Sequence, residues 1–396
     1  MFAGAAARAE QARTYSPGSL RPETARALYG AELHFSSSRI DVLAGCRFAH
    51  FLQYGLRAQE REPAEFDSRF YGTFVHDVLE HVVQQTEREG GFAAVPRSRV
   101  QELAQKRMEQ NAQTLLETFP DSGRTGYLLR RTFDEVTQVV DELYDELSVS
   151  AFRPKFCELE FSARGALPGV AFAGERCRGV VEGFVDRVDV WQSGGRPYVR
   201  VVDYKTGKKS FDYTNVLHGR GLQMLLYLFA LVRQGGHLLH GEPLPAGVLY
   251  FPARIERVSV RDRLAQAEIE KERRKQLRRS GVLLNSDPVL EAMEPCGGSP
   301  RFLPYALDKE GRKTGDLASF VQLAQLERFV FRTVAALGDE LADGRIDPDP
   351  CIRDAKDSAC AFCPYSEICA GHEQPRWLKK ITAEEFWQTL ERREHG

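Results

Sequence analysis

The chain has 396 residues, of which 42% are hydrophobic and 28% are charged, and its formal net charge at pH 7 is −2. This length can bury a large core in one domain with insertions or in two to three domain-sized units. The near-neutral charge gives no overall attraction for nucleic acid, so DNA contacts would have to come from local basic segments. No apolar run approaches the roughly 18 residues of a membrane-spanning helix, and the N-terminus lacks the apolar stretch of a secretory signal. We therefore expect a cytoplasmic globular protein without membrane association.

Helices are predicted through the first 150 residues. Short helices are expected over 15–28 and 36–56, the second after serines that offer N-capping hydroxyls. The clearest helix covers 69–87, because four apolar residues recur on one face of it. These residues are Phe70, Phe74, Val78 and Val82. Charged amphipathic helices follow over 99–148, with a break near 120–123.

After residue 150 the pattern changes to mixed helix and strand. Segments with alternating apolar residues predict strands over 157–163, 179–191, 198–205 and 247–251. The second and third of these form a hairpin, because Ser193-Gly194-Gly195 supplies the turn between them. Further helices are expected over 221–233, 262–279 and 317–341, and irregular segments over 285–301 and 344–369.

These elements predict an α/β (α+β) fold in which helices flank a small mixed sheet. We divide the chain into five segments. They are an N-terminal extension over 1–35, a helical segment over 36–150, the core sheet over 151–260, a helical return over 261–345, and a cysteine-rich loop with a C-terminal helix over 346–396.

Three charged residues are predicted to meet on one face of the hairpin. Asp203 and Lys205 are two apart on a strand, so their side chains emerge on the same side, and Asp186 on the partner strand can lie opposite them. Charges placed inside a small sheet are unfavourable without a compensating ion or substrate. Asp189 is the rival of Asp186, but its opposite parity points it to the other face. The alternative is an ordinary ion pair between Asp203 and Lys205, which is the common meaning of an isolated Asp-x-Lys.

Hydrolysis of a phosphodiester bond would explain this arrangement. Carboxylates hold Mg²⁺ or Mn²⁺, the metal polarises the phosphate and activates a water, and a lysine stabilises the developing charge. His76, on the 69–87 helix, would complete the metal shell.

Four segments then resemble, in order, the motifs of the RecB-like branch of the PD-(D/E)xK nucleases. They are 72–80, 183–189, 202–207 and 223–227. The resemblance implies metal ligation by His76, Asp186, Asp203 and the main-chain carbonyl of Tyr204, catalysis by Lys205, and positioning of DNA or of that lysine by Gln223 and Tyr227.

The cysteines have a spacing that indicates a metal site. Cys360, Cys363 and Cys369 follow a Cys-x2-Cys-x5-Cys pattern, and Cys46 is the candidate for a fourth ligand. Cys351 competes with Cys46 for that position. Zinc is the main rival, but a zinc site more often has two Cys-x2-Cys pairs, so we favour an iron–sulfur cluster, with disulfides below both. The other three thiols, Cys157, Cys177 and Cys296, are interpreted as core or incidental residues.

One cysteine before the nuclease motifs and three after them resemble the iron-staple nucleases, above all the AddB family of helicase–nuclease subunits. This resemblance implies a structural 4Fe-4S cluster and trimming of linear or single-stranded DNA, 5′ to 3′, in double-strand-break repair beside an AddA-type subunit. A CRISPR-adaptation exonuclease and a catalytically silent DNA-binding scaffold are the alternatives. AddB chains are normally much longer, so this sequence is a fragment, a split subunit or a stand-alone relative.

Basic residues gather on the helix expected over 262–279. Four of them are candidates for phosphate contacts: Lys271, Arg274, Lys275 and Arg278. Interspersed glutamates make a solvated helix face an equal alternative.

Overall fold

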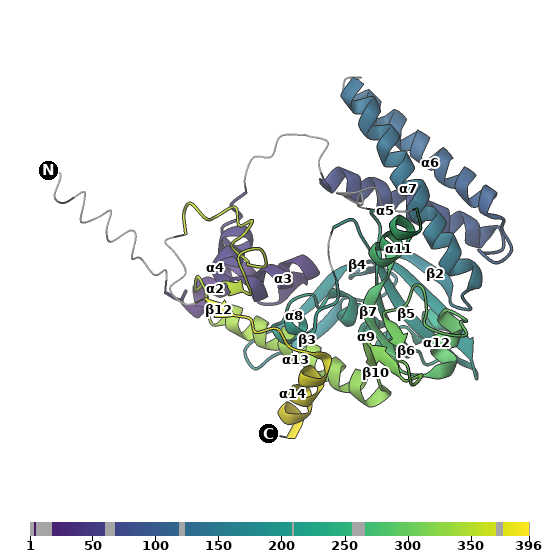
Figure 1. Cartoon of the computed structure of the whole chain (residues 1–396). Coiled ribbons are helices and arrows are strands. Elements are labelled where there is room, and N and C mark those ends of the chain that lie inside the picture. Colours follow the sequence, from purple (N-terminus) through teal and green to yellow (C-terminus); the bar gives the residue numbers. More distant parts are fainter. Residues whose placement is uncertain are drawn as a thin grey trace.

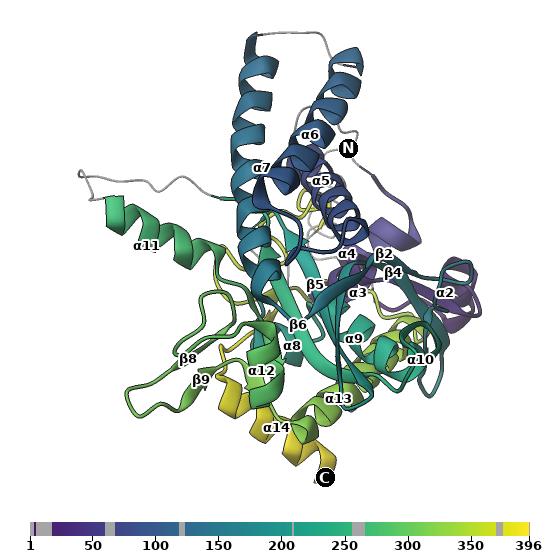
Figure 2. The ribbon, with the colours of Figure 1, turned by 90° about the vertical axis from the view of Figure 1, so that its right-hand side faces the viewer.

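The computed structural model describes residue 4 and residues 18–59, 68–118, 123–207, 210–255, 266–369 and 375–395. An eight-stranded mixed sheet lies between layers of helices (Figures 1 and 2). Its strands are β1 (Leu33–Ser36), β2 (Arg153–Phe161), β3 (Val170–Ala173), β4 (Arg178–Ser193), β5 (Arg196–Lys205), β6 (Leu244–Pro252), β7 (Ser280–Leu284) and β10 (Leu317–Ala318). Two small ribbons pair β8 (Tyr305–Leu307) with β9 (Lys313–Gly315), and β11 (Cys351–Ile352) with β12 (Arg376–Trp377).

The sheet is organised around the long strand β4. The order is β1-β4-β5-β6-β7-β10, and β2 and β3 also pair with β4. The first part of β4 pairs with β1 and β3, while its second part lies between β2 and β5 in antiparallel register. The β5–β6 and β7–β10 pairs are parallel and the β6–β7 pair is antiparallel. The predicted mixed sheet with flanking helices is therefore confirmed.

Three long helices and a second helical group cover the sheet. The first group is α5 (Ser68–Arg88), α6 (Arg97–Thr118) and α7 (Gly123–Val149), which extend beyond the sheet in Figure 2. The second is α8 (Tyr213–Leu217), α9 (Gln223–Gln234), α10 (Gly236–Leu239), α13 (Phe320–Ala342) and α14 (Ala383–His395), in which α9 packs against β5 and β6 and contacts α13. Among the described helices, none combines the length and apolar content needed to cross a membrane.

The remaining helices lie at the N-terminal end and near β7. They are α2 (Pro22–Tyr29), α3 (Ser37–Gly45), α4 (Arg47–His50), the π-helical turn η1 (Phe51–Gly55), α11 (Gln266–Leu277) and α12 (Asp287–Met293). In Figure 1 the segment from α2 to α4 lies beside the cysteine-rich loop near the C-terminus, although these segments are more than 300 residues apart in the sequence.

The structure also corrects several sequence predictions. The helix expected over 36–56 is broken at Cys46, whose extended backbone (φ −163°) ends α3 and precedes α4. The segment 285–301 was expected to be irregular, yet it contains α12, which begins after Ser286 with a proline in its first turn. The short strands β1, β3, β7 and β10 were not predicted. Parts of the expected segments 15–28, 120–123 and 262–279 lie outside the described residues.

A cluster of fully buried charges lies between α7 and the sheet. This buried ionic network consists of Glu146, Arg187, Asp189, Arg200 and Arg279, each at most 2% exposed. Arg187 and Arg200 both donate to Asp189, at 2.8 Å from each Nε. Glu146 accepts from Arg200 Nη2 and Arg279 Nε at 2.9 Å each. The three arginines hold the pKa of Glu146 at about 2 although its burial opposes this shift, so the network keeps the Glu146 carboxylate charged.

We predict that Glu146→Gln lowers the free energy of unfolding by about 3–5 kcal/mol, because it leaves buried arginines uncompensated. Urea unfolding at neutral pH measures the change. The depressed pKa of Glu146 means that its contribution is present above the ordinary pKa of 4.5 and is lost as the pH falls towards about 2. The difference between the two proteins should therefore shrink below pH 4.5.

The control is Asp134→Asn on the same helix, since Asp134 is exposed and its loss should change stability by less than about 0.5 kcal/mol. Equal unfolding free energies for parent and Glu146→Gln would contradict the assigned role of the network.

Candidate functional site

Two aspartates face each other at the centre of the sheet. The β4–β5 register pairs Arg187 with Val202 and Asp189 with Arg200, so its continuation sets Asp186 opposite Asp203 on the other face. Asp203 is 5% exposed, and its Oδ2 lies 2.5 Å from Lys205 Nζ. The rival residue Asp189 lies in the buried ionic network on the opposite face. The structure thus brings Asp186, Asp203 and Lys205 together.

A histidine and a glutamate complete this group. His76 on α5 has its Nδ1 3.5 Å from Asp186 Oδ2 and its Nε2 2.8 Å from the main-chain carbonyl oxygen of Tyr204. Glu158 on β2 joins them, because one ligand atom from each of His76, Glu158 and Asp186 lies within 4.8 Å of the other two. Asp203 lies next to this set of three and outside it.

Glu158 is a site residue that the sequence analysis missed. The β2–β4 register pairs Cys157 with Arg187 and Leu159 with Val185, which sets Glu158 across from Asp186. Its backbone is left-handed (φ 48°), a strained conformation for a residue with a side chain. Only the strand pairing identifies Glu158, because nothing in its local sequence separates it from the neighbouring Glu160.

Asp186, Asp203, Glu158, His76 and Lys205 together form what we call the acidic group. Its buried carboxylates need a nearby cation if all of them are to carry a charge. Burial and the charge of Asp203 raise the pKa of Asp186 well above its usual range. Burial, together with Glu80 and Asp203, also raises the pKa of Glu158. Burial lowers the pKa of His76, so its imidazole is neutral and keeps a lone pair for a ligand.

The donor set fits a hard divalent metal. Carboxylates, one imidazole and a main-chain carbonyl suit Mg²⁺ or Mn²⁺, and a divalent ion would offset the repulsion that raises the carboxylate pKa values. Among the described residues, His76, Glu158 and Asp186 form the one set of three His, Cys, Asp or Glu side chains with this proximity.

Tyr227 lies beneath the strand that carries Asp186. It is 2% exposed, stacks on Phe161 at a centroid distance of 5.0 Å, and its hydroxyl donates to the carbonyl of Glu182 at 3.4 Å. A Cβ at Gly183 would lie 2.1 Å from that hydroxyl, which explains the glycine at this point of β4. Gln223 begins α9, one helical turn before Tyr227.

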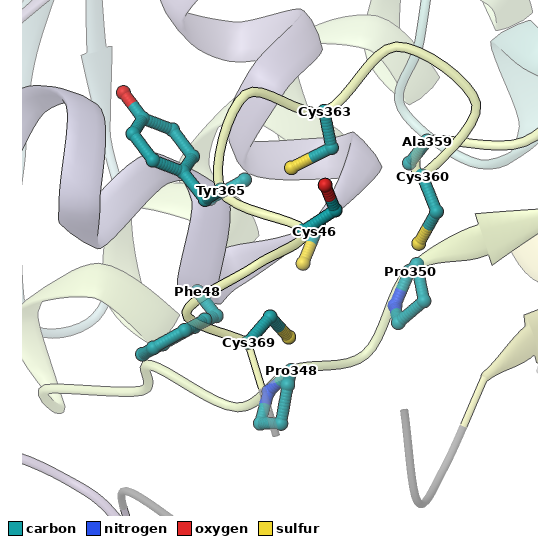
Figure 3. A pocket seen from close by; sticks show the side chains of 11 residues that line it. Cys46, Phe48, Pro348, Pro350, Ala359, Cys360, Cys363, Tyr365 and Cys369 are labelled. Carbon is teal, nitrogen blue, oxygen red and sulfur yellow. The ribbon is translucent and has the colours of Figure 1, made fainter. Parts of the chain in front are cut away.

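Four cysteines line one small cavity. Cys46 comes from the junction of α3 and α4, and Cys360, Cys363 and Cys369 come from the loop after β11. Figure 3 shows their sulfurs around a common space that Phe48, Pro348, Pro350 and Tyr365 help to enclose. Cys351 is not part of this lining, and its Sγ donates to the carbonyl of Ala44 at 3.3 Å. The structure therefore places Cys46, and not Cys351, with the other three.

Hydrogen bonds and ion pairs also join the chain ends around the cavity. Arg47 pairs with Asp349 and Glu340 in a largely buried position. Arg376 Nη2 donates to the carbonyl of Ala44 at 2.7 Å, and Tyr365 donates to the carbonyl of Ala58 at 2.8 Å. Burial raises the pKa of Cys46 to about 11. At neutral pH this cysteine would therefore become a thiolate only if a bound metal displaced its proton.

The predicted basic residues lie in two environments. Lys271, Arg274 and Lys275 are on exposed parts of α11, which extends from the body of the molecule in Figure 2. Lys275 is 3.2 Å from Glu272, one turn away on the same helix. Arg278 follows the helix, and its guanidinium donates to the main-chain carbonyls of Leu303 and Tyr305.

The comparisons with known proteins agree with this geometry. The sequence profile of the PD-(D/E)XK nuclease superfamily matches residues 34–370. The chain is 34% identical over 357 residues to the B-type subunit of the ATP-dependent helicase/deoxyribonuclease of Moorella thermoacetica, covering 89% of this chain and 31% of that protein. The proteins of the same name from Caldanaerobacter subterraneus and Thermoanaerobacter sp. are 31% and 29% identical, covering 88% and 92% of this chain and 30% and 33% of theirs. The chain thus spans about a third of the length of these curated relatives.

The family match extends from β1 to the cysteine-rich loop and includes every residue of the acidic group and all four cysteines around the cavity. This chain belongs to the PD-(D/E)XK nuclease superfamily.

Proposed function

We propose that this chain hydrolyses phosphodiester bonds of DNA with the help of Mg²⁺ or Mn²⁺. The observation that carries the proposal is the meeting of Asp186 and Asp203 beside Lys205, with His76 and Glu158 at their edge. Buried carboxylates of this number are unfavourable without a bound cation. When bound, the metal would polarise the phosphate and lower the pKa of a water.

Each residue has a separate task in this proposal. His76, Asp186, Asp203 and the Tyr204 carbonyl would hold the metal, and Glu158 is a further candidate ligand. Lys205 would stabilise negative charge on the phosphate, for which Asp203 orients its ammonium group. Tyr227 would keep the start of β4 fixed, and Gln223 at the start of α9 would position the lysine or the DNA.

We predict that Asp203→Asn lowers the rate of Mg²⁺-dependent DNA digestion by about 10²- to 10⁴-fold, because it removes several kcal/mol of metal-mediated stabilisation. Digestion of linear DNA labelled at the 5′ or the 3′ end measures both the rate and the polarity. Glu158→Gln should instead raise the Mg²⁺ concentration that gives half of the maximal rate.

The control for this series is Asp134→Asn, which removes an exposed carboxylate outside the site and should leave the rate unchanged. Digestion at the parental rate by Asp203→Asn would refute the proposed chemistry. The cutting would then not come from this site, which would favour a DNA-binding scaffold.

We further propose that the four cysteines hold a structural 4Fe-4S cluster. Their sulfurs surround one cavity, and four thiolates are the usual ligands of such a cluster. A structural zinc site more often has two Cys-x2-Cys pairs, and these four cysteines contain one such pair. The cluster would close a loop of more than 300 residues and reduce the entropy of the unfolded chain.

We predict that Cys46→Ala and Cys363→Ala lose the bound iron and that their thermal midpoints fall, whereas Cys351→Ala keeps its iron. Iron and zinc analysis after anaerobic purification, with an absorption spectrum, measures the first effect, and about four irons per chain are expected in the parent. Iron loss in Cys351→Ala with retention in Cys46→Ala would overturn the assignment of the ligands. Stoichiometric zinc in place of iron would overturn the cluster.

The names of the relatives support a proposal for the biological setting. Their names describe one subunit of an ATP-dependent helicase/deoxyribonuclease, so we propose that this chain acts beside an AddA-type helicase–nuclease subunit and trims DNA ends 5′ to 3′ during double-strand-break repair. Digestion at a rate that an added AddA-type motor subunit does not increase would favour the alternative of a CRISPR-adaptation exonuclease.

A further inference from the structure

A cleft extends the candidate site across the sheet from Lys205. It begins at Lys205 on β5, passes Tyr250 on β6 and reaches Ser280 on β7. These strands are neighbours, and their registers pair Asp203 with Tyr250 and Tyr250 with Ser280. Residues paired in this way lie on the same face of a sheet. The cleft therefore opens directly from the site of the proposed cut, on the side away from Asp186.

The chemistry of the cleft suits a phosphate. Three cations line it, namely Lys205, Arg254 and Arg278, and no carboxylate does so among the described residues. Hydroxyl groups and an amide complete the lining, including Ser210, Ser280 and Gln276. The chain as a whole carries a formal charge of −2, so this excess of positive charge is local. Cations with hydroxyl and amide donors are the usual contacts of a nucleic-acid backbone.

Arg254 is the cation best placed to receive a ligand. Its guanidinium lies 5.0 Å from the centre of the Tyr71 ring on α5, and no carboxylate within the described ranges forms an ion pair with it. Arg278, in contrast, already donates to two main-chain carbonyls. A guanidinium over the face of an aromatic ring uses that face without spending its N–H donors, which lie in the guanidinium's own plane and stay available to a ligand.

We propose that this cleft binds a backbone phosphate next to the one that is cut, with Arg254 as its main cationic contact. The proposal rests on the proposed nuclease function, and it assigns to the substrate strand a direction across β5, β6 and β7. It implies that at least one intact nucleotide must extend past the cut on the Lys205 side for full affinity.

The test compares Arg254→Ala with Arg233→Ala in a chain made inactive by Asp203→Asn. Arg233 is the control outside the cleft. Its guanidinium also lies over a ring, 3.8 Å from the centre of Phe331, but it pairs with Glu327 and does not line the cleft. Arg254→Ala should weaken binding of a single-stranded oligonucleotide by about threefold to tenfold and reduce the slope of log K against log salt by about 0.7–1. In the oligonucleotide, single phosphodiester linkages are then replaced with neutral methylphosphonate. At one position the resulting loss of affinity and the loss caused by Arg254→Ala should not add.

The outcomes separate the two proposals. If the unsubstituted chain neither cuts DNA nor binds it when inactivated, the proposed function fails. If the chain cuts DNA but Arg254→Ala and Arg233→Ala bind with equal affinity and salt slope, the assignment of the cleft is wrong. Thermal midpoints check that both variants fold, and the exposed position of Arg254 predicts no change.

A separate observation concerns the other side of the site. Phe184 lies two residues before Asp186 on β4, so both side chains point to the same face, about 7 Å apart along the strand. Phe184 is 50% exposed, and it is absent from the hydrophobic core. Aromatic rings exposed beside a nucleic-acid site offer a stacking surface for bases, independent of sequence. We infer that Phe184 stacks against a base of the strand on the Asp186 side of the cut.

We predict that Phe184→Ala weakens single-strand binding by at least about fivefold, while Phe184→Trp retains it. The matched control is Phe320→Ala, since Phe320 is similarly exposed (43%) and lies at the start of α13. A double-mutant cycle with an abasic nucleotide at successive positions isolates the stacking contact. At one position, the abasic nucleotide should weaken binding by the parent about as much as Phe184→Ala weakens binding of the intact strand, and combining both changes should cause no further loss. Additive losses at every position would refute the stacking role.

Discussion

The fold depends on the antiparallel pairing of β4 with β5, which sets two aspartates against each other inside the sheet. Asp186 and Asp203 repel one another at close range, and burial raises the pKa of Asp186 well above its usual range. Such an arrangement persists only if the surrounding structure fixes it. Tyr227 under Gly183 and the main-chain N–H of Tyr204, which donates to Asp186 at 2.7 Å, provide that support on the site face.

The buried ionic network supports the acidic site from the opposite face of the sheet. Arg187 and Asp189 alternate with Asp186 and Val188 along β4, so one strand carries the acidic site on one face and the network on the other. Arg187 Nη1 also donates to the hydroxyl of Tyr204 at 3.0 Å, which links the network to the residue whose carbonyl lies beside His76. With three arginines and two carboxylates, the network has an excess positive charge under an acidic site.

The sequence predicts those parts of the site that depend on strand parity or on a known motif. Asp186, Asp203 and Lys205 follow from alternation, whereas His76 on α5 follows from the resemblance of its helix to a nuclease motif. Glu158 could not be predicted in this way, because its position depends on the β2–β4 register and on a left-handed backbone that no local pattern encodes. The same limit applies to β1, β3, β7 and β10. These strands have two to five residues, too few for alternation to be distinguished from chance.

The cysteine cavity shows a different relation between sequence and structure. Three of its thiols are close in sequence, so their spacing alone identifies them, but the fourth comes from more than 300 residues away and had two candidates. The fold decides between them because Arg47, the residue after Cys46, is tied to Glu340 and Asp349, and this turns Cys46 toward the loop while Cys351 bonds to the chain behind it. Protein contacts thus bring the two ends together before any cluster is considered. A cluster bound by these four cysteines, as proposed above, would then lock a junction whose geometry the ion pairs have already set.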